Sequence, residues 1–301
     1  MNTIYISGAS GFLGKHLIAQ LLFEDVEIYA GTSQCESLHR TFVSPNLHIL
    51  PATAFDKVPW KDVQVLINCA YPRNEEGYSL GVGLKYCNDL ITHAVEHGIK
   101  SIINVSSQSV YSQKRVLPAD ENTVLCLESK YAVGKYATEL LVNAICGKAV
   151  LHTNIRLASL IGAGFDQRIV NRLVNQIIKN NEIHIIGGKQ VFGFLDVRDA
   201  ASAIITMTKS INNWYEVYNI GSRNSYTLIE IANTILDVAQ ERYAKRGSMI
   251  LEQNNAFQNS SLNCSRFYED FRWSQKYSIR QSVVDIMDYA YNQDRNSMQN
   301  G

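Results

Sequence analysis

The segment Gly8-Ala9-Ser10-Gly11-Phe12-Leu13-Gly14 decides the fold of this chain. It follows the apolar run Thr3 to Ile6 and opens a stretch with helical spacing of apolar residues. A buried strand, a glycine turn and a helix in this order form a site for a dinucleotide pyrophosphate. The glycines allow a tight turn and close backbone approach, and the helix N-terminus offers free N–H groups to the phosphates.

A second, independent signal lies at Tyr131-Ala132-Val133-Gly134-Lys135. Positions i and i+4 share one face of a helix, so the phenol of Tyr131 and the ammonium of Lys135 would lie side by side. A lysine in this place favours the phenolate form of the tyrosine, which suits a general acid/base near neutral pH. The run from Lys100 to Ser107 predicts a strand that ends in hydroxyls, and such a hydroxyl can hydrogen-bond a substrate oxygen beside the phenol.

With these motifs the chain resembles the extended branch of the short-chain dehydrogenase/reductase superfamily, the NAD(P)-dependent nucleotide-sugar epimerases, dehydratases and reductases. The resemblance covers residues 3–240 and weakens beyond them. The matching segments are GASGFLG at 8–14, VLINCA at 65–70, VSSQSVY at 105–111, YAVGK at 131–135, NIRLASLIGAG at 154–164, FLDVRDAASAI at 194–204 and VYNIGS at 217–222. The resemblance implies an enzyme that transfers hydride to or from a carbon of a nucleotide sugar.

The resemblance also assigns roles to single residues. It implies that catalysis depends on Ser107, on Tyr131 as acid/base and on Lys135, which would also hold the nicotinamide ribose. The implied cofactor contacts are Gly8, Ser10, Gly11, Phe12, Leu13, Gly14, Ser33, Asn68, Cys69 and Ala70, together with Tyr131 and Lys135. The expected substrate contacts are Ser107, Gln108 and Ser159, together with Tyr71, whose loop lies beside the predicted cleft and would otherwise be a solvated loop; no metal is expected.

Two departures from the family pattern narrow the activity. Dehydratases of the family follow their catalytic hydroxyl with an Asp-Glu pair, whereas this chain has Gln108 and Ser109, so we expect an epimerase or a 4-keto reductase. The second strand normally ends in an acid that binds the adenosine ribose of NAD. The segment from Tyr29 to Ser33 lacks one, and Arg40 follows shortly after. NAD and NADP therefore both stay open as cofactors, with NADP slightly favoured.

The substrate pattern departs as well. Many relatives carry an arginine near residues 190–195 that binds the nucleotide diphosphate. Phe192 stands there, with Arg168 and Arg198 as the nearest arginines, and Ser159 takes the place of a usual asparagine. Two alternatives therefore remain: a reductase of a non-sugar carbonyl, and a non-catalytic NAD(P)-sensing regulator. The retained catalytic residues favour an enzyme.

Apolar runs alternate with helical patterns, which predicts an α/β fold with a doubly wound parallel sheet. Strands are expected at 3–6, 26–30, 47–50, 63–70, 101–106 and 150–157, and helices at 13–22, 78–97 and 128–146. The alternation ends after Leu157. We therefore expect a Rossmann domain of residues 1–158, to which 193–221 return, and a smaller C-terminal substrate-binding lobe of residues 159–192 and 222–301. A capping box at Thr227 and Glu230 would open a helix of this lobe.

Composition excludes some partners. The 301 residues are 46% apolar and carry no net charge, which gives no electrostatic basis for binding nucleic acid or an anionic membrane. The six cysteines form no Cys-x-x-Cys, which indicates reduced thiols. The first strand begins at residue 3 and no apolar run reaches transmembrane length, so we expect a cytoplasmic protein without a signal peptide. By analogy with the family, the helices at 78–97 and 128–146 predict a homodimer.

Overall fold

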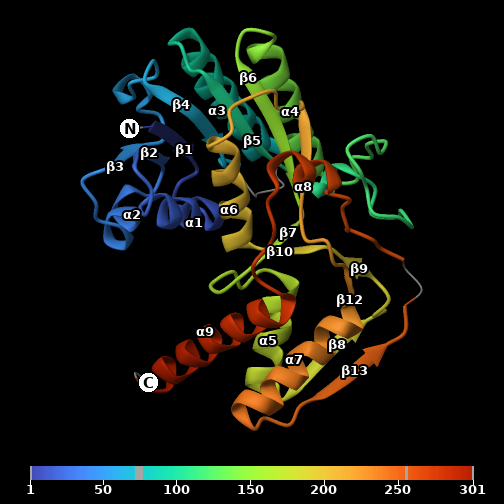
Figure 1. The fold of residues 1–301 in the computed structure, drawn as a ribbon. Coiled ribbons are helices and arrows are strands. Elements are labelled where there is room, and N and C mark those ends of the chain that lie inside the picture. Colours follow the sequence, from blue (N-terminus) through green and yellow to red (C-terminus); the bar gives the residue numbers. More distant parts are fainter. Residues whose placement is uncertain (1, 72–76, 255–256, 300–301) are drawn as a thin grey trace.

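The computed structural model describes residues 2–71, 77–254 and 257–299 (Figure 1). Within these ranges the main sheet has seven parallel strands in the order β11-β6-β5-β4-β1-β2-β3. Their bounds are β1 Asn2–Ser7, β2 Val26–Thr32, β3 Leu47–Pro51, β4 Val63–Asn68, β5 Ser101–Ser107, β6 Leu151–Leu157 and β11 Val217–Ile220. The chain starts in the middle of the sheet and winds outward to both edges, which confirms the doubly wound Rossmann fold.

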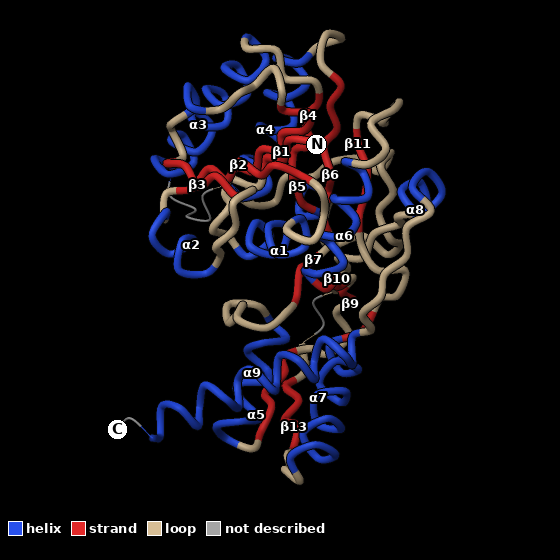
Figure 2. The backbone as a smooth tube through the Cα atoms, turned by 60° about the vertical axis from the view of Figure 1, so that its left-hand side comes forward, coloured by secondary structure: helices blue, strands red, loops and turns tan. Residues whose placement is uncertain are grey.

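Helices cover both faces of this sheet (Figure 2). α3 (Gly77–Glu96) and α4 (Lys130–Cys146) pack together on one face, and α1 (Phe12–Leu21) and α6 (Val197–Thr208) pack together on the other. Successive side chains of a strand point to opposite faces. Ile4 and Ile6 of β1 therefore enter the apolar cluster beside α1, while Tyr5 enters the cluster beside α3. Burial on both faces explains why the strands appear in the sequence as continuous apolar runs.

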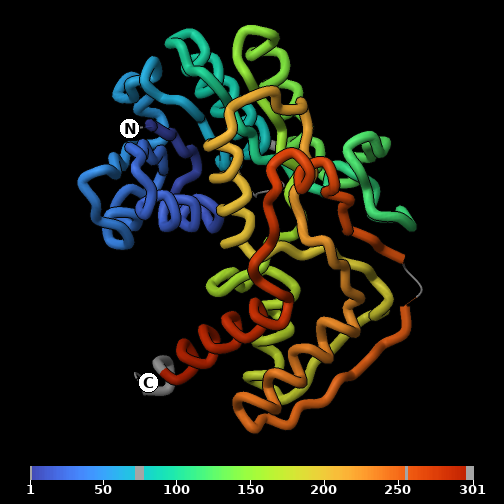
Figure 3. Tube along the Cα trace, viewed as in Figure 1, coloured from blue at the N-terminus to red at the C-terminus, as the bar shows by residue number. Residues whose placement is uncertain are grey.

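A second, smaller body lies below the sheet in Figures 1 and 3. It contains α5 (Ile169–Asn180), β8 (Glu182–Ile186), α7 (Leu228–Tyr243), β13 (Ser248–Glu252) and α9 (Ile279–Gln299). The apolar sides of its helices meet in a separate cluster, with Ile177, Ile235 and Ile286 almost fully buried. The expected capping box is present, because the Thr227 hydroxyl accepts from the Glu230 N–H while the Glu230 carboxylate accepts from the Thr227 N–H.

Two short strand pairs join the bodies. β7 (Ser159–Ile161) lies parallel to β10 (Phe194–Asp196), and β9 (Val191–Phe192) lies antiparallel to β12 (Tyr226–Thr227). We expected all of residues 222–301 in the lobe, but Leu262, Phe267 and Trp273 are buried in the cluster of the sheet. Phe267 belongs to α8 (Ser265–Phe271), which packs on the edge strand β11. Residues 262–273 thus pack with the sheet, and the rest of the domain division stays a prediction.

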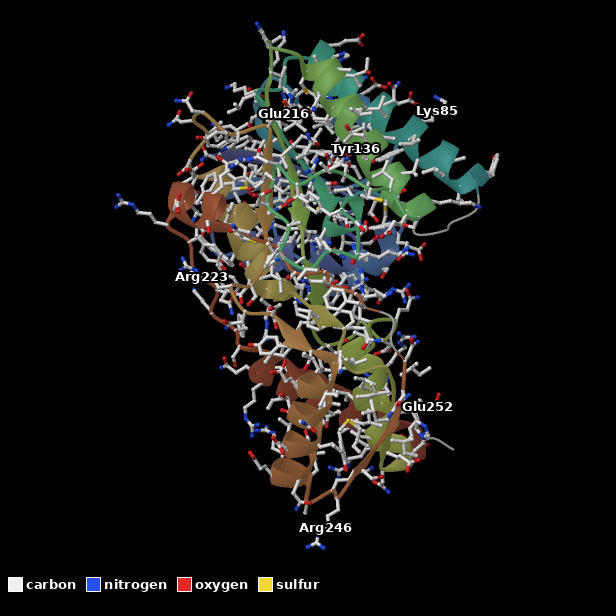
Figure 4. The ribbon with its side chains drawn as sticks, turned by 90° about the vertical axis from the view of Figure 1, so that its right-hand side faces the viewer. Lys85, Tyr136, Glu216, Arg223, Arg246 and Glu252 are labelled. Carbon is white, nitrogen blue, oxygen red and sulfur yellow. The ribbon has the colours of Figure 1, made fainter. Side chains whose placement is uncertain are left out.

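The molecule is elongated when viewed from the side in Figure 4, with Lys85 and Tyr136 toward one end and Arg246 at the opposite end. The two bodies are tied by charged contacts as well as by strands. Arg198 of α6 forms salt bridges with Asp196, at 2.8 Å, and with Asp285 of α9, at 2.7 Å. In the described part of the chain, no helix is long and apolar enough to cross a membrane.

Candidate active site

Two adjoining cavities follow the carboxyl ends of the parallel strands, where doubly wound sheets bind their ligands. The first, which we call the Tyr131 cavity, has a volume of about 310 Å³. The second, the Ser33 cavity, has a volume of about 420 Å³. Both are lined by Gly8, Gly11, Cys69 and Tyr71, so the two cavities form one cleft.

The glycine turn forms the floor of this cleft. Gly8 has a φ of +66°, and a Cβ there would approach the main-chain atoms of Ala70 and Cys69 to 2.8–3.0 Å. A Cβ on Gly14 would lie 2.6 Å from the Gly8 carbonyl oxygen, because α1 packs this closely on the turn. Gly11 caps α1 without a side-chain hydrogen bond, so the N–H groups of the first turn remain available. Such a turn fits the pyrophosphate of an NAD-type cofactor.

The structure brings the three predicted catalytic residues to one wall of the Tyr131 cavity. Ser107 ends β5, and Tyr131 and Lys135 lie on the first turns of α4, whose N-cap Ser129 accepts from the Ala132 N–H. The Lys135 ammonium is nearly buried and donates to the Val105 carbonyl oxygen at 2.8 Å. An ammonium has three donors, so Lys135 can also hydrogen-bond a ribose hydroxyl.

Tyr71 packs directly against Tyr131 and Lys135. Its ring centroid lies 4.4 Å from the Lys135 ammonium and 5.2 Å from the Tyr131 ring, which it meets edge to face. The Tyr71 hydroxyl donates to the main-chain oxygen of Tyr131 at 3.4 Å. A Cβ on Gly134 would overlap that hydroxyl, so the glycine makes room for it. Burial, together with the nearby Tyr131, raises the pKa of Tyr71 to about 12, which keeps this phenol neutral at physiological pH.

Most of the other residues that we expect to contact cofactor or substrate also line the cleft. Phe12, Leu13, Cys69, Gln108 and Ser159 line the Tyr131 cavity, and Ser10, Ser33 and Ala70 line the Ser33 cavity.

Asn68 is the exception among the predicted contacts, because it lines neither cavity. Its side chain is 1% exposed, accepts from the Ser7 hydroxyl at 2.6 Å and donates to Asn104 at 3.0 Å. The amide therefore links β1, β4 and β5 beneath the cleft. We expected the fourth strand to continue to residue 70, but β4 ends at Asn68 and the following residues turn toward the cleft.

The Ser33 cavity is lined by hydroxyls and apolar groups. Among the described residues, no charged side chain lines it, so it contains neither a ribose-binding acid nor a phosphate-binding cation. Thr32 donates to the Ser10 hydroxyl at 2.7 Å and fixes the loop at this end. Arg40 does not line the cavity and instead lies 3.8 Å from Glu36 on the exposed helix α2 (Cys35–Thr41).

The sequence analysis did not predict that residues of the lobe line the Tyr131 cavity. Phe165 and Arg168, which precede α5, line the Tyr131 cavity opposite the Rossmann residues. Phe165 stacks on Phe12, with ring centroids 4.1 Å apart, and so closes the cavity between the glycine turn and the lobe. The only sequence signal for this wall is that Arg168 is one of the two arginines nearest to the family's missing diphosphate ligand.

A buried ion pair joins α4, the helix of Tyr131 and Lys135, to the sheet. Arg156 of β6 contacts Glu139 of α4 with two hydrogen bonds, at 2.7 and 3.1 Å, and donates to the Tyr111 hydroxyl at 2.9 Å. Ser106 also donates to Glu139. Burial lowers the pKa of Arg156, but the hydrogen bonds and charge of Glu139 more than offset this, so that the pKa is raised. The pair joins α4 to β5 and β6 beside the residues that face the cavity.

Comparison with known proteins agrees with this geometry. The sequence model of the NAD dependent epimerase/dehydratase family matches residues 4–221. A putative UDP-glucose 4-epimerase of Methanocaldococcus jannaschii is 22% identical, over 97% of this chain and 99% of its own length.

Solved structures of similar fold span nearly the whole chain. The UDP-N-acetylglucosamine 4-epimerase from Bacillus cereus has a TM-score of 0.81 at 21% identity, covering 95% of this chain and 96% of that one. The dTDP-glucose 4,6-dehydratase from Bacillus anthracis, solved with NAD, has a TM-score of 0.82 at 19% identity, covering 98% of each chain. The fold, the cleft and the family match lead to one conclusion: this chain belongs to the NAD dependent epimerase/dehydratase family and is an enzyme that uses an NAD-type cofactor.

Proposed function

We propose that the protein transfers hydride to or from a carbon of a nucleotide sugar, as an epimerase or a 4-keto reductase, with Tyr131 as the acid/base. One observation carries the proposal: Ser107, Tyr131 and Lys135 line the same cavity as the glycine turn. The cleft therefore places a proton-transfer group and a dinucleotide site within reach of one substrate.

Each catalytic residue then has a distinct task. An NAD-type cofactor, when bound, supplies the hydride acceptor or donor. Tyr131 takes the proton from a sugar hydroxyl during oxidation and returns it during reduction. The Ser107 hydroxyl hydrogen-bonds the same sugar oxygen and orients it toward the phenol. Lys135 would hold the nicotinamide ribose through its remaining ammonium donors.

Dehydration fits this cavity less well. Elimination of water needs an acid and a base beside the sugar in addition to the tyrosine. Among the described lining residues there is no Asp or Glu, and Gln108 and Ser109 follow the catalytic hydroxyl instead. Neither side chain can serve as a carboxylic acid. The proposal is therefore restricted to epimerisation and carbonyl reduction.

The cofactor choice follows from the Ser33 cavity. The cavity has no described carboxylate to repel a 2′-phosphate, and the hydroxyl of Ser33 can hydrogen-bond one. This supports the slight preference for NADP that we expected. The margin is small because no described lysine or arginine lines the cavity. Dissociation constants for NADH and NADPH test this, and a strong NADH preference would contradict it.

We also propose a homodimer that forms through α3 and α4. Tyr78 of α3 and Val133 and Leu140 of α4 are 85, 42 and 50% exposed, so these helices present large apolar side chains to solvent. Burial of such side chains against a second copy would stabilise the pair. The cytoplasmic location stays a prediction from sequence.

The first experiment identifies any dinucleotide that the freshly purified protein releases on denaturation, by absorbance and mass. Retained NAD would support an epimerase, which must return the hydride to the same sugar. An empty protein that binds NADPH would support a 4-keto reductase. A protein that neither retains nor binds any of these dinucleotides would overturn the proposal.

The second experiment removes the proposed acid/base. Tyr131→Phe should lower kcat by about 10²- to 10⁴-fold while cofactor binding persists, because only the proton-transfer group is lost. Tyr136→Phe is the matched control, since Tyr136 lies on the same helix but does not line the cavity (Figure 4). Near-normal turnover of a nucleotide sugar by the Tyr131 variant would refute the mechanism. Turnover confined to small non-sugar ketones would favour the alternative reductase.

A further inference from the structure

The Tyr131 cavity contains a cation that the proposed proton transfer does not use. Arg168 lines it from the lobe side, where it is the N-cap residue of α5. Its guanidinium carbon lies 5.0 Å from the centroid of the Phe165 ring, which supports the side chain from one side. The Arg168 Nε is buried without a hydrogen-bond partner. A buried donor without an acceptor costs free energy, so a ligand that accepts from it is stabilised.

A second orphaned polar atom faces the same cavity. The hydroxyl oxygen of Ser109 is buried and has no hydrogen-bond partner, and Ser109 lines the cavity from the Rossmann side. Buried polar atoms are rarely left unpaired. Two such atoms among the residues of one cavity favour a polar ligand that pairs with them.

The charged residues that line the cavity indicate the sign of the charge on that ligand. Lys135 and Arg168 are the charged residues among those described on its walls, and both are positive. In the described part of the chain, Arg168 forms no salt bridge that would cancel its charge. A partly enclosed site with two cations and no carboxylate favours an anion.

The other arginine near the expected diphosphate ligand is already engaged. Arg198 is bound by Asp196 and Asp285, and its guanidinium lies 3.6 Å from the centre of the Tyr277 ring. Phe192, at the place where relatives carry their arginine, stacks on Phe194 with centroids 5.4 Å apart. Arg198 can therefore receive a phosphate only by breaking existing contacts, and Phe192 has no donor for one.

We propose that Arg168 binds the diphosphate of the nucleotide-sugar substrate, in place of the arginine that Phe192 replaces. The inference rests on the proposed function and assigns the residue that selects its substrate class. A guanidinium donates two parallel hydrogen bonds to phosphate oxygens, which gives both affinity and orientation. A diphosphate at Arg168 would place the attached sugar on the side of Ser109 and Tyr131.

The diphosphate of the cofactor is the other group that Arg168 could bind. Phe165 lies near Arg168 and stacks on Phe12, at the N-terminus of α1, where the cofactor pyrophosphate is expected. That pyrophosphate already has the glycine turn and the free N–H groups of α1. Arg168 belongs to the lobe, whereas all the residues that we expect to bind the cofactor belong to the Rossmann half. The substrate is therefore the better match, and binding measurements separate the two sources.

The test compares Arg168→Gln and Arg168→Lys with the wild-type enzyme. Calorimetry measures the binding of UDP, dTDP and GDP and of the matching nucleosides, and fluorescence titration measures NADH. We expect Arg168→Gln to weaken the best nucleoside diphosphate by about 10- to 100-fold, because a charge-assisted pair of hydrogen bonds is lost. Nucleoside and NADH affinities should change by less than about twofold. Arg168→Lys should bind the nucleoside diphosphate with intermediate affinity, since it keeps the charge but lacks the two parallel N–H donors of the guanidinium.

Arg172→Gln is the matched control. Arg172 lies one turn further along α5, is exposed and does not line the cavity, so its removal changes the charge of the protein equally. The control should bind nucleoside diphosphates like the wild type. Unchanged nucleoside and NADH binding by Arg168→Gln also shows that this variant is folded.

Three outcomes would overturn the inference, and they differ in whether they also reject the proposed function. Equal binding of nucleoside diphosphates by the wild type and Arg168→Gln rejects the role of Arg168 and leaves the proposed function intact. Loss of NADH affinity in place of diphosphate affinity assigns Arg168 to the cofactor. A wild-type enzyme that binds NADH but no nucleoside diphosphate rejects the nucleotide-sugar substrate as well.

Discussion

Removal of Arg156 should destabilise the protein strongly, because it would leave a buried carboxylate without its partner. The Arg156 and Glu139 side chains are 5 and 2% exposed, and they share two hydrogen bonds. Arg156→Met keeps an apolar side chain of substantial length in the same space but removes the charge and every donor. Glu139 would then have Ser106 as its remaining described hydrogen-bond donor.

The size of the effect follows from these contacts. Two unit charges about 4 Å apart attract by about 4 kcal/mol at an effective dielectric constant of about 20. Breaking a buried ion pair by removing one partner costs about 3–5 kcal/mol. The lost hydrogen bond from Arg156 to the Tyr111 hydroxyl acts in the same direction. We therefore expect the free energy of unfolding to fall by about 3–5 kcal/mol, out of the 5–15 kcal/mol that is typical of folded proteins.

Urea unfolding at neutral pH, followed by circular dichroism, measures this loss. With a slope of about 3 kcal/mol per molar, the midpoint should fall by about 1–1.7 M. Lys85→Met is the control, because it breaks the Lys85–Asp89 pair, whose side chains are 75 and 41% exposed. Exposed pairs contribute less than about 1 kcal/mol.

A double variant tests whether the unpaired carboxylate causes the loss of stability in Arg156→Met. Glu139→Leu combined with Arg156→Met removes both charges, so it should recover a large part of the lost stability. A loss in Arg156→Met no larger than in the exposed control would refute the reasoning. Equal losses in the single and double variants would show that packing, and not the unpaired carboxylate, causes the effect.

Two further variants test local structure. Gly14→Ala should abolish NADH binding in a fluorescence titration, because its Cβ would lie 2.6–2.8 Å from main-chain atoms of Gly8 and Ala9; retained binding would contradict this. Gly81→Ala, whose Cβ meets nothing within 4 Å on α3, should keep NADH binding and raise stability by up to about 1 kcal/mol. Glu230→Ala removes the capping box and should lower the free energy of unfolding at neutral pH by about 0.5–1 kcal/mol. Hydrogen bonds from Thr227 lower the pKa of Glu230 below 4.5, so this stabilisation is present above 4.5 and is lost as the pH falls through the folded value. An equal difference between variant and wild type in acid and at neutral pH would exclude the carboxylate as its source.

The sheet was predictable because its signals are local. The central strands are buried on both faces and appear as apolar runs, so the observed bounds of the six expected strands lie within two residues of the expected ones. The edge strand β11 was not expected as a strand of this sheet. The glycine turn was predictable for the same reason, since the close contacts of Gly14 join it to residues only a few positions away. Tyr131 and Lys135 share a helix face that the i, i+4 spacing defines. In all these cases the structural constraint lies within a short segment.

The missed features depend on contacts between distant segments. Asn68 ends an apolar strand in the sequence, but its orientation depends on the polar partners Ser7 and Asn104 on two neighbouring strands. Residues 262–273 follow the lobe in the chain and yet pack on β11, because Phe267 completes an aromatic contact with Tyr218. Neither partner is visible in the local pattern.

The role that we propose for Arg168 illustrates why family alignment predicts the chemistry of this site better than its substrate contacts. Proton transfer and cofactor binding need several groups at fixed relative positions, and a short strand–turn–helix segment preserves those positions. A phosphate ligand needs only a guanidinium that reaches the right place, and any element on the cavity wall can supply one. An arginine that is absent at position 192 can therefore be replaced by one at position 168, as we propose, without any change in the fold. The physical test for such a replacement is the one that Arg168 meets: a position on the cavity wall, a buried donor without a partner, and a charge that no described carboxylate neutralises.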